Sequence, residues 1–265
     1  MSERRVRLAA LVSHPIQYQA PLFRALAQEP GIDLEVLFCS KAGLQSHRDK
    51  GFGVAVQWDV PLLDGYAHRF VPNISPRPNP SSSLGVINPQ VYGAIRNGRF
   101  DVVWVHGWSL LSNWFGFASA FRSHVPVLLR GETNGLAEPA GCKGILKRNL
   151  LGRLFRKVDA VLAVGTQNAE FYKAYGVPQD KIFVAPYTVD NDRFKAQAEV
   201  LVPQKRKLRR EAGLPEEQPL ILFCGKLQPY KRPMDLLAAY AMLPPELGAS
   251  LMFVVMPLNL RQNAF

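Results

Sequence analysis

Residues Leu220–Pro233 read L-I-L-F-C-G-K-L-Q-P-Y-K-R-P, and this stretch decides the predicted fold. Five apolar residues end at Gly225, and Pro233 opens a run with apolar residues at helical spacing. This order predicts a buried strand, a turn, and a helix that begins at proline. Such a turn lies at the carboxyl end of its strand, where open α/β sheets bind ligands. Because the turn carries Lys226 and Lys231 next to a helix N-terminus, we expect it to bind an anion.

The two lysines do not form a glycine-rich phosphate-binding loop. The arrangement G-x4-G-K-[ST] is absent, so backbone N–H groups are not expected to wrap around phosphates. Two ammonium groups on either side of a turn can still bind a diphosphate as point charges. On spacing alone, a solvated turn with ordinary surface lysines fits Lys226 and Lys231 equally well.

Strands and helices alternate over most of the chain before this stretch. The predicted strands are Val6–Val12, Asp33–Phe38, Val102–Val105, Val127–Leu129, Ala160–Val164 and Ile182–Ala185. The predicted helices are Ala20–Gln28, Leu110–Phe121, Lys143–Lys157 and Gln167–Tyr175. The proline-rich segment from Pro72 to Pro89 is predicted as a surface loop that shapes a cleft. The alternation predicts an α/β fold with one complete doubly wound, Rossmann-like domain, followed by the β-α-β start of a second.

The composition favours an acidic partner. The formal net charge is +11 and the pI is about 9.8, which suits phosphate groups, an anionic membrane or nucleic acid. The three cysteines, Cys39, Cys142 and Cys224, form neither a disulfide framework nor a metal-binding spacing. The N-terminal apolar run is too short for a signal peptide, and no segment has the length of a membrane-spanning helix. We expect a cytoplasmic protein that can touch the inner face of the cell membrane.

A series of motifs runs in one order along the chain. It consists of Ser13–Arg24, Ala163–Thr166, Tyr175–Ile182, Pro186–Phe194, Gly225–Lys231 and Asp235–Ala239. The series resembles the GT-B glycosyltransferases of family four, the "group 1" retaining enzymes, in which Y-G-V-P-x-x-K-I, P-x-G-V-D-x3-F and G-R/K-L-x3-K occur in this order. The resemblance extends from residue 6 to about 240.

The resemblance implies a nucleotide diphosphate sugar as donor. Gly225, Lys226 and Lys231 would hold its diphosphate, and the two cations would stabilise the charge that develops on the leaving group. It also implies a saccharide or lipid-linked acceptor on the first domain and retention of configuration. No metal and no cofactor are expected, because side-chain cations replace the metal. Lysine at position 226, where arginine is commoner, keeps the charge but loses bidentate geometry.

Four polar residues come just after predicted strands of the first domain. They are His14, His106, Arg130 and Glu132. Because the carboxyl ends of parallel strands meet at one edge, we expect these side chains to face the cleft as catalytic candidates. The resembled family often has a histidine where this chain has Arg130-Gly131-Glu132. A turn or capping role is the alternative for each residue.

Asp190-Asn191-Asp192 spells D-x-D, a metal–diphosphate motif of another glycosyltransferase fold. We interpret Asp190 instead as the cap of a short helix, because no histidine or carboxylate cluster supports a metal there.

Two helices are strongly basic. Lys143–Lys157 carries an apolar stripe of Leu146, Leu150, Leu154 and Val158, which predicts packing on the sheet with a solvated basic face. The alternative is peripheral contact with an anionic membrane through helix 143–157. The second basic helix, Lys205–Leu214, lacks interleaved aromatic residues, so no nucleic acid is expected as a partner.

We therefore predict an acceptor-binding domain over 1–194, a basic linker helix over 195–218, and a truncated donor domain over 219–265. After Glu246 the sequence has no Asp or Glu, whereas the resembled family has an acidic pair that contacts the donor there. We expect this to impair transfer. The alternative function is a non-catalytic basic module that binds an acidic surface, either an anionic membrane or nucleic acid.

Overall fold

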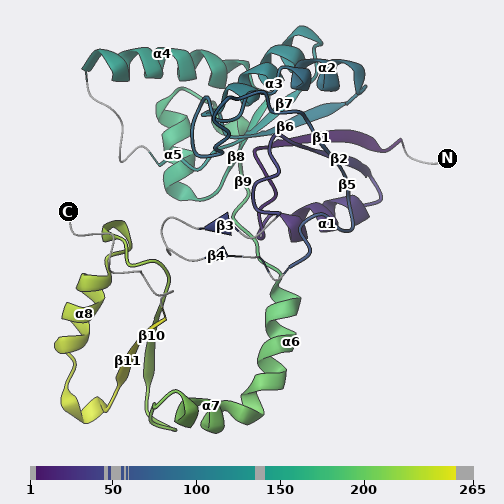
Figure 1. The fold of residues 1–265 in the computed structure, drawn as a ribbon. Helices are drawn as coiled ribbons and strands as arrows, with labels where there is room; N and C mark the ends of the chain where they lie inside the picture. The colour runs from purple at the N-terminus through teal and green to yellow at the C-terminus, as the bar shows by residue number, and fades with distance from the viewer. Residues whose placement is uncertain are drawn as a thin grey trace. The chain divides into compact units, whose positions relative to one another are not determined.

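The computed structural model describes residues 4–44, 47–48, 55–56, 58, 60–134 and 141–254 (Figure 1). Contacts divide the chain into two compact units. Unit 1 comprises Met1–Leu44 and Trp58–Val189, and unit 2 comprises Gln45–Gln57 and Asp190–Phe265. Each unit is described by itself below.

Unit 1 contains a seven-stranded sheet in which every strand pairing is parallel. The order across the sheet is β5-β2-β1-β6-β7-β8-β9. The strands are β1 (Val6–Val12), β2 (Ile32–Phe38), β5 (Ala67–Phe70), β6 (Val102–His106), β7 (Val127–Arg130), β8 (Ala160–Ala163) and β9 (Ile182–Val184). From β1 the chain adds strands first on one side and then on the other. This is the doubly wound arrangement that the sequence predicts.

The helices of unit 1 are α1 (Ala20–Gln28), α2 (Gln90–Asn97), α3 (Leu111–Arg122), α4 (Gly141–Lys157) and α5 (Thr166–Ala174), with a short 3₁₀ turn at Gln179–Lys181. The sequence analysis missed β5 and α2. The strand A-H-R-F lies at an edge with no residue fully buried, and α2 buries only Val91 and Ile95, so neither has a strong apolar pattern.

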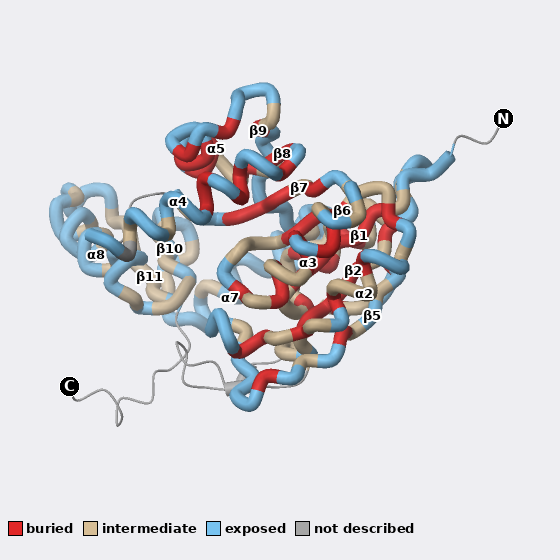
Figure 2. The backbone as a smooth tube through the Cα atoms, turned by 90° about the horizontal axis from the view of Figure 1, so that it is seen from above, coloured by how far each residue is buried: buried red, intermediate tan, exposed pale blue. Residues whose placement is uncertain are grey.

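The core lies on both faces of the sheet. Along β1, Leu8, Ala10 and Val12 belong to one cluster, and Ala9 and Leu11 belong to the other. A strand with helices on both faces needs apolar residues at every position rather than at every second one. Figure 2 shows this as nearly continuous burial through the central strands of unit 1.

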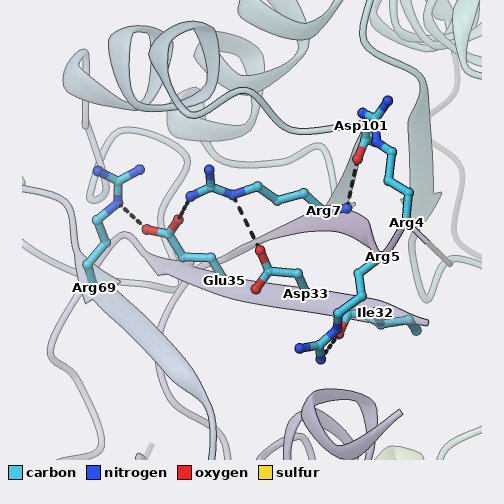
Figure 3. A network of polar contacts seen from close by, with 8 residues as sticks. All are labelled: Arg4, Arg5, Arg7, Ile32, Asp33, Glu35, Arg69 and Asp101. Carbon is cyan, nitrogen blue, oxygen red and sulfur yellow. Dashed lines mark hydrogen bonds and ion pairs between the residues drawn. The ribbon is translucent and has the colours of Figure 1, made fainter. Parts of the chain in front are cut away.

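A polar network links β1, β2 and β5 with the residue that precedes β6 (Figure 3). Glu35 of β2 pairs with Arg69 of β5 at 2.9 Å and with Arg7 of β1 at 3.5 Å. Arg4 pairs with Asp101, just before β6. Because most of these side chains are well exposed, each pair contributes little to stability, about 0–1 kcal/mol.

Unit 2 contains two small sheets. Its elements are β3 (His47–Arg48), β4 (Ala55–Val56), α6 (Asn191–Leu201), η2 (Val202–Gln204), α7 (Lys205–Glu211), β10 (Leu220–Cys224), η3 (Pro229–Lys231), α8 (Pro233–Ala241), η4 (Pro245–Leu247) and β11 (Ser250–Val254). β3 pairs antiparallel with β4, and β10 pairs parallel with β11 across α8. The predicted β-α-β unit is therefore present.

Two details of unit 2 correct the sequence analysis. The helix that Asp190 caps is longer than the short one expected, because α6 runs on to Leu201. The predicted buried strand is not buried: none of the five residues of β10 is fully shielded from solvent. Between Asp190 and Val254 no residue is buried.

Candidate active site

A pocket lies at the carboxyl ends of β1, β6 and β7. β1 and β6 are neighbours from which the chain proceeds in opposite directions, so the pocket occupies the point where the strand order reverses. Its volume is about 300 Å³. Three segments line it: Val12, Ser13, Ile16 and Gln19 after β1, His106 to Ser109 at the end of β6, and Arg130 to Thr133 at the end of β7.

His106, the last residue of β6, presents a neutral imidazole to this pocket. Its Nδ1 lies 3.2 Å from Nε2 of the buried Gln19. Its Nε2 is buried and has no hydrogen-bond partner among the described residues. Burial, with a smaller effect from Arg130, lowers the pKa of His106 to about 3. The ring is therefore uncharged at neutral pH, and Nε2 is the nitrogen left for a ligand.

The turn after β6 is held from α3. Gly107 adopts a φ of +84°, a region that favours glycine, and its N–H donates to the carbonyl of Arg130 at 2.6 Å. The side-chain amide of Asn113 donates to the carbonyls of His106 at 2.8 Å and Gly107 at 2.9 Å. Asn113 was not predicted. The signal was the one amide side chain of the mainly apolar helix α3, which needs a hydrogen-bond partner when buried.

Arg130 places a cation in the wall of the pocket. Only 6% of the residue is exposed, and its Nη2 donates to the carbonyl of Pro186 at 3.3 Å. The guanidinium lies 4.8 Å from the ring centre of Tyr187, whose ring meets Tyr18 edge-on at 5.1 Å. Burial lowers the pKa of Arg130, and Glu132 opposes that change. Arginine remains charged throughout, so the pocket wall has a fixed positive charge.

Glu132 follows two residues later and lines the pocket, although its residue is exposed to solvent. Burial raises the pKa of its carboxyl group, while Arg130 acts in the opposite direction. A carboxylate with a raised pKa at the wall of a pocket is suited to accept a hydrogen bond or a proton from a bound hydroxyl.

Position 131, between Arg130 and Glu132, has no room for a side chain. A Cβ at this position would lie 2.0 Å from Cζ3 of Trp108, a pocket-lining residue. Trp108 cannot move away easily, because its ring stacks on Phe171 and meets Phe155 edge-on at 5.2 Å. The glycine therefore lets the β7 turn pass beneath the indole.

His14 does not join the other three candidates. It is absent from the residues that line the pocket, and its Nδ1 lies 2.9 Å from the hydroxyl of Ser13, which does line it. Its ring faces the position where Gly43 would carry a Cβ, at 3.8 Å. The structure thus brings together His106, Arg130 and Glu132, and a catalytic role for any of the four stays a prediction.

The predicted diphosphate turn lies in unit 2. Gly225 follows β10 with a φ of +156°, and its N–H donates to the carbonyl of Val254 at 3.2 Å. Lys226 is half-exposed, and Lys231 is exposed with its Nζ 5.5 Å from the ring centre of Tyr230. The binding of a diphosphate by Gly225, Lys226 and Lys231 stays a prediction.

Arg232 adds a third cation to this turn, which the sequence analysis did not assign. Its φ is +54°, and its guanidinium pairs with Asp235 in the first turn of α8 at 2.5 Å. The Asp235 carboxylate offsets the charge of Arg232. The experiments on this turn therefore concern Lys226 and Lys231. The ion pair at i and i+3 was visible in the sequence.

The D-x-D sequence is a helix cap, as predicted. The Asp190 side chain accepts a hydrogen bond from the N–H of Arg193 at 3.1 Å and begins α6. Among the described residues, no group of three His, Cys, Asp or Glu side chains could hold a metal ion. Within those residues, no helix is long and apolar enough to cross a membrane.

Comparison with known proteins gives a family match over most of unit 1. The model of the glycosyl transferase 4-like domain matches residues 15–188. The D-inositol 3-phosphate glycosyltransferase of Xylanimonas cellulosilytica is 31% identical over 171 residues, which are 62% of this chain and 40% of that protein. The enzyme of the same name from Streptomyces scabiei is 29% identical over 59% of this chain and 35% of its own length. The chain thus matches less than half of these relatives.

Solved structures share the fold. Anabaena HepE in complex with UDP and glucose aligns with a TM-score of 0.59 and 14% identity, over 94% of this chain and 60% of that one. The UDP-GlcNAc 2-epimerase of Methanocaldococcus jannaschii aligns with a TM-score of 0.52 and 12% identity, over 95% and 66%. The fold is of the GT-B type, with one complete Rossmann-like domain and the first β-α-β of a second.

Proposed function

Because the chain belongs to the glycosyl transferase 4-like domain family, we propose that it transfers a sugar from a nucleotide diphosphate sugar to an acceptor hydroxyl, with retention of configuration. The observation that supports this most is the pocket at the reversal of strand order, where His106, Arg130 and Glu132 meet. The pocket has a volume of about 300 Å³ and is lined by a cation, a carboxylate and a neutral imidazole. These groups suit a small polyhydroxyl molecule better than an apolar one.

We assign the acceptor to this pocket and infer that it bears an anionic group. The buried guanidinium of Arg130 has no carboxylate within ion-pair distance among the described residues, so a phosphate or carboxylate of the acceptor would complete its coordination. Relatives named D-inositol 3-phosphate glycosyltransferase support a phosphorylated polyol or saccharide, free or lipid-linked. Glu132 would accept the proton of the reacting hydroxyl, and Nε2 of His106 would position a second hydroxyl.

We assign the donor diphosphate to the turn after β10. Lys226 and Lys231 would neutralise the leaving diphosphate, so that charge developing on the breaking bond is stabilised without a metal. Structures with the same fold that contain UDP or UDP-glucose support a nucleotide donor. The distribution of these groups over two units matches a division between acceptor and donor binding.

Binding of the two substrates can be measured separately by isothermal titration calorimetry. D-inositol 3-phosphate is expected to bind at least ~10-fold more tightly than inositol, and Arg130→Gln should abolish that difference. Arg130→Lys serves as the control for folding, because it keeps the charge. An unchanged preference for the phosphorylated polyol in Arg130→Gln would contradict the assignment of the acceptor site.

Donor binding is tested with UDP and GDP. Lys226→Ala and Lys231→Ala are each expected to weaken binding of the preferred nucleotide by ~10-fold or more, because a charged hydrogen bond is lost. The matched control is Lys205→Ala with Lys207→Ala on α7, which removes two charges from the basic helix of unit 2. Equal affinity in all variants would contradict the donor site, and NMR of the product anomer tests retention.

A further inference from the structure

The apolar stripe of α4 does not lie on the sheet along its whole length. Leu154 and Val158 are buried, at 4% and 0% exposed, whereas Leu146 is 71% exposed and Leu150 is 47% exposed. Ile145 beside them is 64% exposed. The sequence predicts packing of the entire stripe, so this expectation is wrong for the first half of the helix. That half presents leucine and isoleucine to solvent.

The exposed row leads into an apolar groove between α4 and α3, two neighbouring helices of unit 1 (Figure 1). The groove has a volume of about 400 Å³. Its floor and walls are mainly aromatic and aliphatic, with Trp114, Phe117, Ala118 and Phe121 from α3 and Leu150 and Leu154 from α4.

Cations surround this groove. Arg153, Arg156 and Lys157 line its rim and are exposed. Within the described residues none of them forms an ion pair, and Lys157 lies with its Nζ 5.8 Å from the ring centre of Phe121. The sequence has no Asp or Glu from 110 to 126 or from 141 to 158, so neither helix supplies a carboxylate. A partner that fits must be apolar in its interior and anionic at its edge.

We propose that the α3/α4 groove docks on an anionic phospholipid membrane, with an acyl chain in the groove and lipid phosphates on Arg153, Arg156 and Lys157. The combination of features selects lipid. Nucleic acid would match the charge but would leave Leu146, Leu150 and the groove facing water or phosphate. Buried leucines together with arginines at a headgroup are the features of an interfacial helix.

The groove and the pocket share a wall. Nε1 of Trp114, which lines the groove, donates to the carbonyl of Trp108 at 2.9 Å, and Trp108 lines the pocket. Phe155 of α4 packs on the same indole. If the acceptor is lipid-linked, this shared wall would place the membrane beside the acceptor pocket. This link between docking and transfer rests on the proposed function, whereas docking itself does not.

Vesicle co-sedimentation of the 265-residue chain tests the docking independently of transfer. Binding is expected to vesicles of phosphatidylcholine with 30% phosphatidylglycerol, and to be ~100-fold weaker to pure phosphatidylcholine. Arg153→Gln, Arg156→Gln and Lys157→Gln together should lose ~100-fold, at about tenfold or less per charge. The matched control is Lys205→Gln, Arg206→Gln and Lys207→Gln on α7. Equal loss in the control would overturn the proposal in favour of general charge attraction.

The groove itself is tested first with substitutions of exposed residues. Leu146→Ser with Leu150→Ser should weaken binding by at least ~10-fold, whereas Met242→Ser, at another exposed apolar residue, should not. Ala118→Trp should fill the groove and exclude an acyl chain. Lipids brominated on the acyl chain should quench tryptophan fluorescence, and Trp114→Phe should remove most of that quenching. Full quenching in Trp114→Phe, or no binding by the unaltered chain, would overturn the proposal.

Discussion

The turn that follows β7 and the turn that follows β10 occupy equivalent places in their sheets, yet they are supported very differently. Around the first, Arg130 is buried, Trp108 covers Gly131, and the amide of Asn168 donates to the carbonyl of Thr133 at 2.6 Å. In the second, Lys231 is exposed, and the ion pair between Arg232 and Asp235 lies at the surface. In Figure 2 the burial of the central strands of unit 1 has no counterpart in β10 and β11.

The difference shows what a parallel sheet needs for order at its ligand-binding edge. β6 and β7 have strands on both sides and helices on both faces, so their turns are fixed by tertiary contacts. β10 has one partner strand, β11, and among the described residues none of its side chains is fully buried. We infer that unit 1 supplies a preorganised site, whereas the turn of unit 2 depends mainly on its local hydrogen bonds.

Hydrogen exchange gives the largest expected contrast. Amides of β1 and β6 should exchange at least ~1000-fold more slowly than amides of β10 and β11, because the buried strands open only with the core of unit 1. Exchange measured by NMR or mass spectrometry on the same sample checks this. Comparable protection of the amides in β6 and β10 would contradict the proposed difference in order between the two units.

Acid should destabilise unit 1 through His106. Its pKa is about 3 in the folded protein against 6.5 for an ordinary histidine, so between these values the unfolded chain binds the extra proton. Stability should therefore fall as pH drops from about 6.5 towards 3, by at most about 1.4 kcal/mol per pH unit from this group.

His106→Asn should remove that slope while keeping a side chain that can contact Gln19. Urea titrations at several pH values in this range measure it. A variant as acid-sensitive as the unaltered chain would show that other groups carry the effect.

A methyl group at position 131 should disturb the pocket. Gly131→Ala places a Cβ 2.0 Å from Trp108 and is expected to cost about 1–3 kcal/mol in the free energy of unfolding. Gly165→Ala is the matched control, since nothing lies within 4 Å of a Cβ there, and should change stability by about 0.5 kcal/mol or less. Equal Tm values for the two variants would contradict the close contact between position 131 and the Trp108 ring.

The smallest expected effect is at the start of unit 2. Asp190→Ala removes the acceptor for the N–H of Arg193 and should destabilise α6 locally by about 1 kcal/mol. Asp192→Ala, in the first turn but without that hydrogen bond, should cost less. Faster amide exchange at the start of α6 in the first variant alone would confirm the cap.

Most of the fold was predictable because the strands of unit 1 are nearly continuous apolar runs, as a sheet covered on both faces requires. β5 was missed because an edge strand needs only a weak pattern, and half of A-H-R-F is polar. The burial of β10 was overpredicted, because an apolar run shows what a strand can cover and not which neighbours are present. The division into predicted acceptor and donor domains at 194 and 219 stays a prediction.

The sequence predicted which strand ends form the site, but not every side chain that lines it. The rule for strand ends correctly brought His106, Arg130 and Glu132 to one pocket. It failed for His14, because turn geometry decides which side chain lines the pocket, and Ser13 does so instead. The supporting role of Asn113 becomes visible in its hydrogen bonds, which join it to a strand end seven residues away.

The long loop between β5 and α2 is a suitable place to exchange sequence between related chains. The side-chain amide of Asn88 donates to the carbonyls of Cys39 at 3.0 Å, Val71 at 2.7 Å and Pro72 at 2.9 Å, and it accepts a hydrogen bond from Ser112 at 2.7 Å. One side chain thus holds the entry and exit of the loop together. Segments of other lengths could be grafted around Pro78 and Pro80 while the sheet keeps its register, provided that the fully buried Val86 is kept. Pro78 and Pro80 line a second pocket together with Ser40 and Lys41, so variation at these prolines would change that pocket at little cost to the rest of unit 1.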